Sequence, residues 1–172
     1  MKFDPQKHHR RSIRLKGYDY TQTGAYFITI VVWQRECLFG GIVDGEMRLN
    51  QFGKIVQRAW LDLPKHYPHV QLGTFCIMPN HVHLVLIPYE ISDTADYSLT
   101  KIMHNIKRNS ANHANKFLGR TGAFWQHESY DHFARDDKEL ERIIKYVFYN
   151  PVKANLVKEQ ADWKWSYCKY EM

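Results

Sequence analysis

Long hydrophobic runs are missing from this sequence, and none approaches the ~20 consecutive apolar residues that a membrane-spanning helix needs. The first 20 residues, MKFDPQKHHRRSIRLKGYDY, also lack the apolar centre of a secretory signal peptide. Cysteine is scarce as well. Cys37, Cys76 and Cys168 are odd in number, and no pair has the C-x-x-C spacing of a zinc or redox site. These absences predict a cytoplasmic protein with free thiols and no membrane partner.

Acidic residues are fewer than basic ones, and the balance gives a formal charge of +6 over 172 residues. Such a positive field favours polyanionic partners, nucleic acid first, although a merely basic soluble protein has the same composition. The 44% hydrophobic content supports one well-packed domain over residues 1–172, without repeats or low-complexity tracts. Residues 1–16 hold six Lys or Arg and a single acid, and we interpret them as a basic arm that becomes ordered on a partner.

Strand and helix patterns alternate along the chain. Strands are predicted over residues 25–33, 70–78, 81–87 and 130–135, a hairpin over 38–49 with Asp44-Gly45 as its turn, and helices over 51–65, 98–118 and 136 to about 150. Ser98 and the Asp136–Glu139 capping box mark the starts of the last two helices. Without the hairpin and the last helix, the order is βαββαβ. We therefore predict an α+β fold, a ferredoxin-like antiparallel sheet with helices packed on it and an extra C-terminal helix.

Two histidines stand one residue apart in the stretch MPNHVHLVL. Side chains alternate along a strand, so His81 and His83 share a face, with Cα atoms roughly 6.5–7 Å apart. The apolar side chains of Val82, Leu84 and Leu86 then point to the other face. Two imidazoles in this arrangement can converge on one metal ion, because neutral histidine is a common metal ligand. The alternative is a pair of unrelated histidines at the end of a sheet.

The last predicted helix carries a tyrosine beside its buried stripe. That stripe consists of Leu140, Ile143, Ile144, Val147 and Phe148. Tyr146 lies about 130° from the centre of the stripe and Asn150 about 90°, so both occupy one flank, one turn apart. Tyr149 points away from the core, and Pro151 places Asn150 at the helix end. Tyr146 is either an amphipathic residue at the rim or a nucleophile. A nucleophile needs help, because the ordinary phenol pKa is near ~10.

These motifs together resemble a known family. MPNHVHLVL is similar to the histidine–hydrophobic–histidine motif of the single-tyrosine HUH transposases. Four further segments resemble the branch of REP-associated tyrosine transposases: RSIRLKGYDYTQTGAYFITI, AFWQHESYDHFAR, LERIIKYVFYNPVKANLV and WKWSYCKY. The resemblance covers nearly the whole chain. It departs from many relatives at Asn150, where they carry Gln, and at His127, where they carry Arg.

The resemblance implies a mechanism. His81, His83 and Asn150 would hold a divalent metal, Mg²⁺ or Mn²⁺, and Tyr146 on the extra, catalytic helix would be the nucleophile. The family cleaves single-stranded DNA next to a hairpin, leaves a 5′-phosphotyrosine and a free 3′-hydroxyl, and rejoins strands by the reverse attack without ATP. His132 is a candidate to orient a ligand, or else a surface histidine with its own partner. The resemblance is compatible with a monomer or with a homodimer that exchanges the tyrosine helix.

Basic side chains offer a surface for DNA. Residues 97–120 contain no acid, and the arm adds further positive charge. The candidate phosphate contacts are Lys101, Lys107, Arg108, Lys116 and Arg120 in this stretch and Arg10, Arg11, Arg14 and Lys16 in the arm.

Two other functions fit parts of the pattern. A ferredoxin-like sheet with a basic surface also suits a nucleic-acid-binding module without catalysis, but that gives the histidines and Tyr146 no common purpose. A metal-dependent nuclease that uses water needs the histidines but not Tyr146. A domesticated protein that binds hairpins without moving DNA is also consistent with the sequence.

Overall fold

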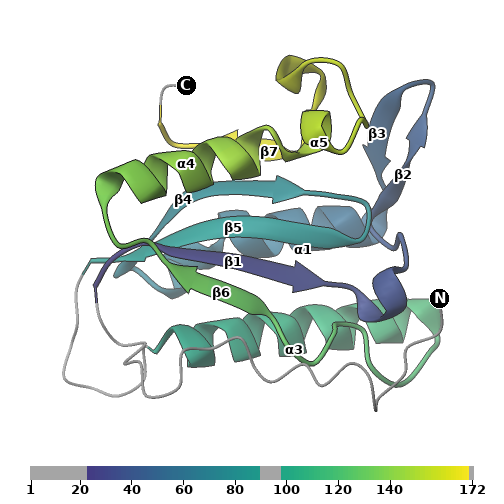
Figure 1. Cartoon of the computed structure of the whole chain (residues 1–172). Coiled ribbons are helices and arrows are strands. Elements are labelled where there is room, and N and C mark those ends of the chain that lie inside the picture. Colours follow the sequence, from purple (N-terminus) through teal and green to yellow (C-terminus); the bar gives the residue numbers. More distant parts are fainter. Residues whose placement is uncertain (1–22, 90–97, 171–172) are drawn as a thin grey trace, which may run out of the picture.

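A computed structural model describes residues 23–89 and 98–170 of the chain. Five strands form one antiparallel sheet in the order β6–β1–β5–β4–β7 (Figure 1). They are β1 (Tyr26–Val31), β4 (Val70–Ile77), β5 (His81–Pro88), β6 (Tyr130–Phe133) and β7 (Ser166–Cys168). The first four of these in spatial order have the ferredoxin-like βαββαβ arrangement, so the predicted fold class is confirmed.

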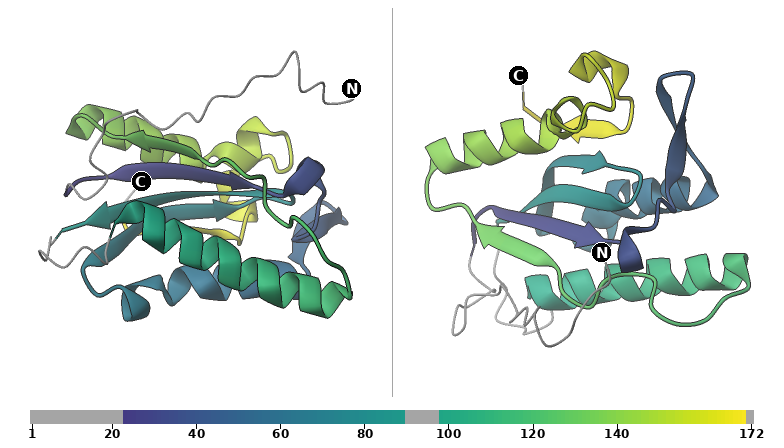
Figure 2. Two further views of the ribbon diagram at one scale, coloured as in Figure 1. Left: turned by 90° about the horizontal axis from the view of Figure 1, so that it is seen from below. Right: turned by 45° about the vertical axis from the view of Figure 1, so that its right-hand side comes forward.

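Helices cover both faces of the sheet (Figures 1 and 2). On one side lie α1 (Gln51–Leu61), the single turn α2 (Leu63–His66) and the long α3 (Leu99–Leu118), with α1 and α3 packed against each other. On the other side lies α4 (Asp137–Phe148), followed by the short α5 (Asn150–Lys153). The hairpin of β2 (Gly40–Val43) and β3 (Glu46–Leu49) is a separate two-stranded sheet. No helix in the described ranges is long and apolar enough to cross a membrane.

The starts of α3 and α4 follow the predicted caps. The Ser98 hydroxyl accepts a hydrogen bond from the backbone nitrogen of Lys101 at 3.3 Å. The carboxylate of Asp136 accepts from the backbone nitrogen of Glu139 at 2.7 Å, and Glu139 reaches back to the backbone nitrogen of Arg135 at 2.8 Å. These caps fix where each helix begins and therefore which side chains reach the sheet.

Prolines break two of the predicted helices. The pattern over residues 51–65 divides at Asp62 into α1 and α2, because Pro64 has no N–H for the Trp60 carbonyl and its ring would clash with that carbonyl. The last helix likewise ends at Phe148, and a new turn starts at Asn150, directly before Pro151.

Three short elements differ from the sequence expectation. The strand predicted over residues 25–33 ends at Val31 and gives way to a 3₁₀ turn, η1 (Trp33–Arg35). The strand β7 and the 3₁₀ turn η3 (Gln160–Asp162) were not predicted.

The segment between α3 and β6 is fixed against the sheet and α3. Val32 and Trp125 form an isolated antiparallel bridge, and the Trp125 indole N–H donates to Ser110 Oγ at 2.9 Å. The Lys107 ammonium donates to the backbone oxygens of Gln126 and His127 at 2.8 and 3.1 Å. These contacts anchor the segment where it enters β6, beside the pocket described next.

Candidate active site

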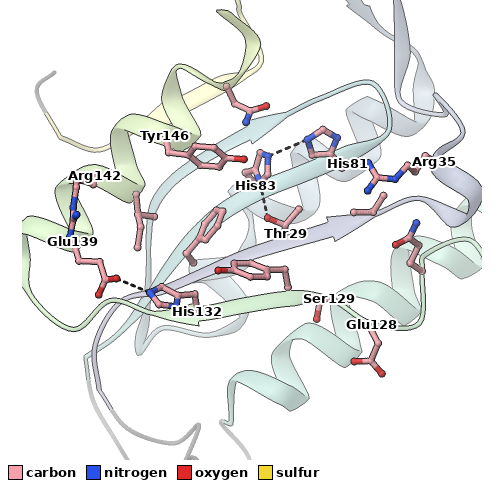
Figure 3. Close-up of a pocket in the computed structure, with 16 residues that line it drawn as sticks. Thr29, Arg35, His81, His83, Glu128, Ser129, His132, Glu139, Arg142 and Tyr146 are labelled. Carbon is pink, nitrogen blue, oxygen red and sulfur yellow. Dashed lines mark hydrogen bonds and ion pairs between the residues drawn. The ribbon is translucent and has the colours of Figure 1, made fainter. Parts of the chain in front are cut away.

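A cavity of about 780 Å³ lies between α4 and the sheet, along β6, β1 and β5 (Figure 3). Its lining includes His81, His83, Tyr146 and Asn150, the four residues predicted to carry the chemistry, together with His132. The structure therefore brings into one pocket side chains that come from β5, β6, α4 and α5.

The two histidines lie on the same face of β5, as the strand alternation predicted. Their Nε2 atoms are 3.1 Å apart. Two ligands at right angles and about 2.1 Å from an ion would be ~3.0 Å apart, so this spacing fits two neighbouring positions around one divalent ion. The described residues contain no cluster of three or more His, Cys, Asp or Glu side chains that could hold a metal. The amide oxygen of Asn150 is a neutral ligand type, and Asn150 lines the same pocket, so it could complete such a site.

Asn80 fixes the tautomer of His81. The Asn80 amide nitrogen donates to the backbone oxygen of Arg35 at 3.1 Å, so its amide oxygen faces His81 Nδ1, 2.6 Å away. His81 Nδ1 must then carry the proton, which leaves Nε2 with its lone pair. His83 Nδ1 lies 2.7 Å from the Thr29 hydroxyl, which can donate or accept a hydrogen bond. This contact therefore allows His83 Nε2 to be either protonated or unprotonated.

Burial keeps both rings neutral. It lowers the pKa of His81 to about 4, with a smaller contribution from the positive charge of Arg35. It lowers the pKa of His83 to about 3, with a smaller contribution from His81. At neutral pH the pair can therefore accept a cation without first losing protons.

Tyr146 packs directly on His83. Its ring lies 5.4 Å from the His83 ring and 5.8 Å from the Phe27 ring, both nearly edge-to-face. The side chain is 39% exposed, and among the described residues its hydroxyl has no hydrogen-bond partner. The Lys153 ammonium lies 4.9 Å from the ring centroid. Tyr149 is also exposed but does not line the pocket, which agrees with the helix rotation expected from the sequence.

Asn150 sits at the junction of α4 and α5. Its side chain is 9% exposed and lines the pocket, although it belongs to the turn after the helix. The break at Tyr149 follows from Pro151, which has no N–H for the Val147 carbonyl, and Asn150 becomes the first residue of α5.

His132 contacts α4 and neither of the paired histidines. Its Nε2 lies 3.0 Å from the Glu139 carboxylate, which also caps the start of α4. Its strand, β6, is two strands away from β5. The contact ties the edge of the sheet to the helix that carries Tyr146, and the predicted role in orienting a metal ligand stays a prediction.

The turn η1 is strained. Gln34 and Arg35 have φ values of 55° and 59°, and a left-handed non-glycine residue costs about 1–3 kcal/mol. Such strain persists only where neighbouring contacts hold it. Here they include the hydrogen bond from Asn80 to the Arg35 carbonyl and one from Arg35 N to the Val32 carbonyl at 2.9 Å.

Comparison with known proteins places the chain in a family. The family model described as transposase IS200-like matches residues 50–150. The chain belongs to the IS200-like transposase family. An uncharacterized protein of Haemophilus influenzae is 34% identical over 168 residues, 88% of this chain and 93% of that protein. The REP-associated tyrosine transposase of Escherichia coli is 23% identical over 149 residues, 86% of this chain and 78% of that protein.

A solved structure, that of a REP-associated tyrosine transposase bound to a REP hairpin, has the same fold. Its TM-score is 0.61 at 18% identity, covering 87% of this chain and 79% of that one. The resemblance to the REP-associated branch inferred from the sequence is thus confirmed.

The basic residues of this transposase divide into two groups. Lys107 holds the segment before β6, and the Arg120 guanidinium pairs with Glu36 at 3.2 Å, so both contribute to packing. Lys101, Arg108 and Lys116 are exposed on α3. The arm, with Arg10, Arg11, Arg14 and Lys16, lies outside the described residues.

Sequence reasoning did not single out three residues of the transposase pocket. Thr29 was hidden because its pairing with His83 depends on the register between β1 and β5. Arg35 lines the pocket only because the chain turns sharply after β1. Asn80 alone carried a signal, since it directly precedes the first histidine in the motif.

Proposed function

We propose that this transposase cleaves single-stranded DNA beside a hairpin and rejoins it through a phosphotyrosine on Tyr146. The observation that supports the proposal is the direct contact between the Tyr146 ring and His83 in a pocket that also contains His81 and Asn150. A binding module has no need for a tyrosine whose ring packs on one of two neutral histidines in the same pocket.

The two histidines and Asn150 would hold Mg²⁺ or Mn²⁺. Such an ion, when bound, neutralises charge on the scissile phosphate and makes its phosphorus easier to attack. The chain's own contribution is to keep the ligands ready. Asn80 holds His81 with its Nε2 lone pair exposed, and Thr29 supports His83 from the opposite ring nitrogen.

Tyr146 would form the covalent bond. Its oxygen attacks the phosphorus in line with the 3′-oxygen, the P–O3′ bond breaks, the phenol proton passes to solvent and the departing 3′-oxygen takes up a proton. The product is a 5′-phosphotyrosine, whose bond energy is kept for the reverse attack by a 3′-hydroxyl. Lys153 is placed to stabilise negative charge on the ring or on a phosphate beside it.

Hairpin DNA is the partner that the fold supports best. The solved structure of similar fold contains a REP hairpin, and we extend that partner to this chain. Arg108 and Lys116, which form no ion pair in the described part of the chain, are suitable phosphate contacts.

The test is covalent capture on single-stranded hairpin oligonucleotides with Mn²⁺. Tyr146→Phe should lose both cleavage and the protein–DNA adduct while it keeps fold and DNA binding, and the neighbouring variant Tyr149→Phe should keep all of them. Cleavage without an adduct by Tyr146→Phe would identify a nuclease that uses water. Absence of cleavage by the unmodified protein, with equal binding of RNA and DNA, would favour a binding module.

A further inference from the structure

Arg35 is an uncompensated positive charge in the pocket. Its side chain is exposed, lines the cavity and extends toward His81 (Figure 3). Within residues 23–89 and 98–170, its guanidinium makes no ion pair and no hydrogen bond. The carboxylates that line the same cavity are directed elsewhere, Glu128 to His127 and Glu139 to His132.

The backbone holds Arg35 in this place at a conformational cost. Two successive left-handed residues, Gln34 and Arg35, form the turn, and the Asn80 side chain bonds the Arg35 carbonyl at 3.1 Å. The same Asn80 side chain accepts from His81. One amide thus connects the position of Arg35 with the orientation of a proposed metal ligand, and strain of this kind is concentrated at functional sites.

A lone guanidinium is unfavourable beside a site for a bare cation. It repels a divalent ion at His81 and His83, and no described carboxylate offsets that repulsion. The effect of Arg35 on metal binding becomes favourable when an anion binds together with the ion. A phosphate diester has the planar pair of oxygens that an arginine recognises with two parallel hydrogen bonds.

We propose that Arg35 binds the scissile phosphate and thereby couples metal binding to DNA binding. The inference rests on the proposed function of the pocket. Without DNA, Arg35 weakens metal binding. With DNA bound, its charge is matched by the phosphate, and the ion binds more tightly. Because such coupling is reciprocal, the metal also strengthens DNA binding by the same factor.

The first measurement is calorimetric titration of the intact protein with Mn²⁺ alone at pH 7.5. Arg35→Gln should bind Mn²⁺ roughly three- to tenfold more tightly, the effect of one unit charge on a divalent ion across a solvated pocket. Arg35→Lys keeps the charge and should retain the original affinity. Arg58→Gln is the matched control, since it removes an exposed guanidinium from α1 on the other face of the sheet and should change nothing.

The second measurement is cleavage of a single-stranded hairpin oligonucleotide at saturating Mn²⁺. Here Arg35→Gln should be slower by about ten- to hundredfold, the loss expected for a charged hydrogen bond to phosphate. Arg35→Lys should recover part of the rate. In a Tyr146→Phe background, which cannot form the adduct, adding the oligonucleotide should tighten Mn²⁺ binding, and Arg35→Gln should reduce that enhancement.

The proposal predicts that Arg35→Gln raises the Mn²⁺ affinity and lowers the cleavage rate, whereas a packing role predicts a loss of both. If Arg35→Gln weakens both Mn²⁺ binding and cleavage, Arg35 only supports the turn and the proposal is wrong. If the unmodified protein binds Mn²⁺ and cuts DNA while Arg35→Gln alters neither, the proposal fails and the proposed function stands. If the unmodified protein binds no Mn²⁺ and cuts no DNA, both fail.

Discussion

The two faces of strand β5 meet different environments although their residues alternate along a single strand. Val82, Leu84 and Leu86 are fully buried, and strand alternation places them on the face opposite the histidines, which α1 and α3 cover. His81 and His83 face α4 and the pocket. The first face gains free energy from apolar burial, whereas the second contains imidazoles whose burial disfavours their charged form.

The contrast between the two faces shows how the fold accommodates two buried imidazoles. A buried polar ring is costly unless its ring nitrogens find partners, and here Asn80 and Thr29 supply one for each histidine. The apolar face of the same strand supplies the stability and holds the backbone in register. We therefore expect substitutions on the two faces to separate function from stability.

The largest effect is expected on DNA cleavage, from substitutions on the pocket face of β5, which contains His81 and His83. His83→Ala or His81→Ala should reduce DNA cleavage below detection, because each removes a proposed metal ligand. Hairpin binding measured without metal should stay within a few-fold, since phosphate contacts elsewhere supply most of the affinity. Gel-based cleavage and binding assays on one oligonucleotide provide the check, and wild-type cleavage by the double variant would rule out the metal site.

The next largest effect is expected on stability, from substitutions on the core face of β5, which contains Val82, Leu84 and Leu86. Leu84→Ala should lower the free energy of unfolding by about 2–5 kcal/mol, the range for truncating a fully buried leucine. Its folded molecules should still cut DNA, because Leu84 points away from the pocket. Urea unfolding measures the first quantity, and cleavage per folded molecule at low temperature measures the second. A selective loss of cleavage in Leu84→Ala would break the separation of the two faces.

The sequence predicted the parts of this arrangement that depend on local periodicity. Alternation along β5 put the histidines on one face, and the helical repeat put Tyr146 and Asn150 on one flank, away from Tyr149. The order of elements then gave the ferredoxin-like sheet. None of these steps needed to know which segments meet in space.

What the sequence did not predict depends on tertiary contacts. The pairing of Thr29 with His83 is set by strand register. The orientation of the Arg35 side chain toward the pocket is set by a strained turn that Asn80 stabilises. The strand β7 has only three residues, too few for a recognisable alternation, and forms because Thr74 to Cys76 offer it an edge. Its tryptophan-rich flank gave a family resemblance but no structural assignment.

The pH dependence of the free energy of unfolding should reveal the cost of burying His81 and His83. The folded pKa values of His81 and His83, about 4 and about 3, lie below the unfolded value near 6.5. As the pH falls below about 6.5, the unfolded chain takes up protons that the folded chain refuses, so the metal-free protein loses stability. Each histidine contributes up to about 1.4 kcal/mol per pH unit. The double variant His81→Ala/His83→Ala should show a flatter dependence between pH 6.5 and 5 in urea unfolding, and equal slopes would contradict the burial of neutral rings.

The smallest effect should come from Asn80, which lies just before β5 and touches neither the DNA phosphate nor the metal in the proposed mechanism. Asn80→Ala removes the acceptor that keeps the proton on His81 Nδ1, so part of the population would carry it on Nε2, where it blocks a ligand. Loss of such an outer partner typically weakens metal binding by about tenfold or more. Calorimetry with Mn²⁺ should show that weakening, and excess Mn²⁺ should restore much of the cleavage, which it cannot do for His81→Ala. Nitrogen-15 NMR of the metal-free protein reports the tautomer directly. Should His81 keep its proton on Nδ1 in Asn80→Ala, another contact would have to orient the ring.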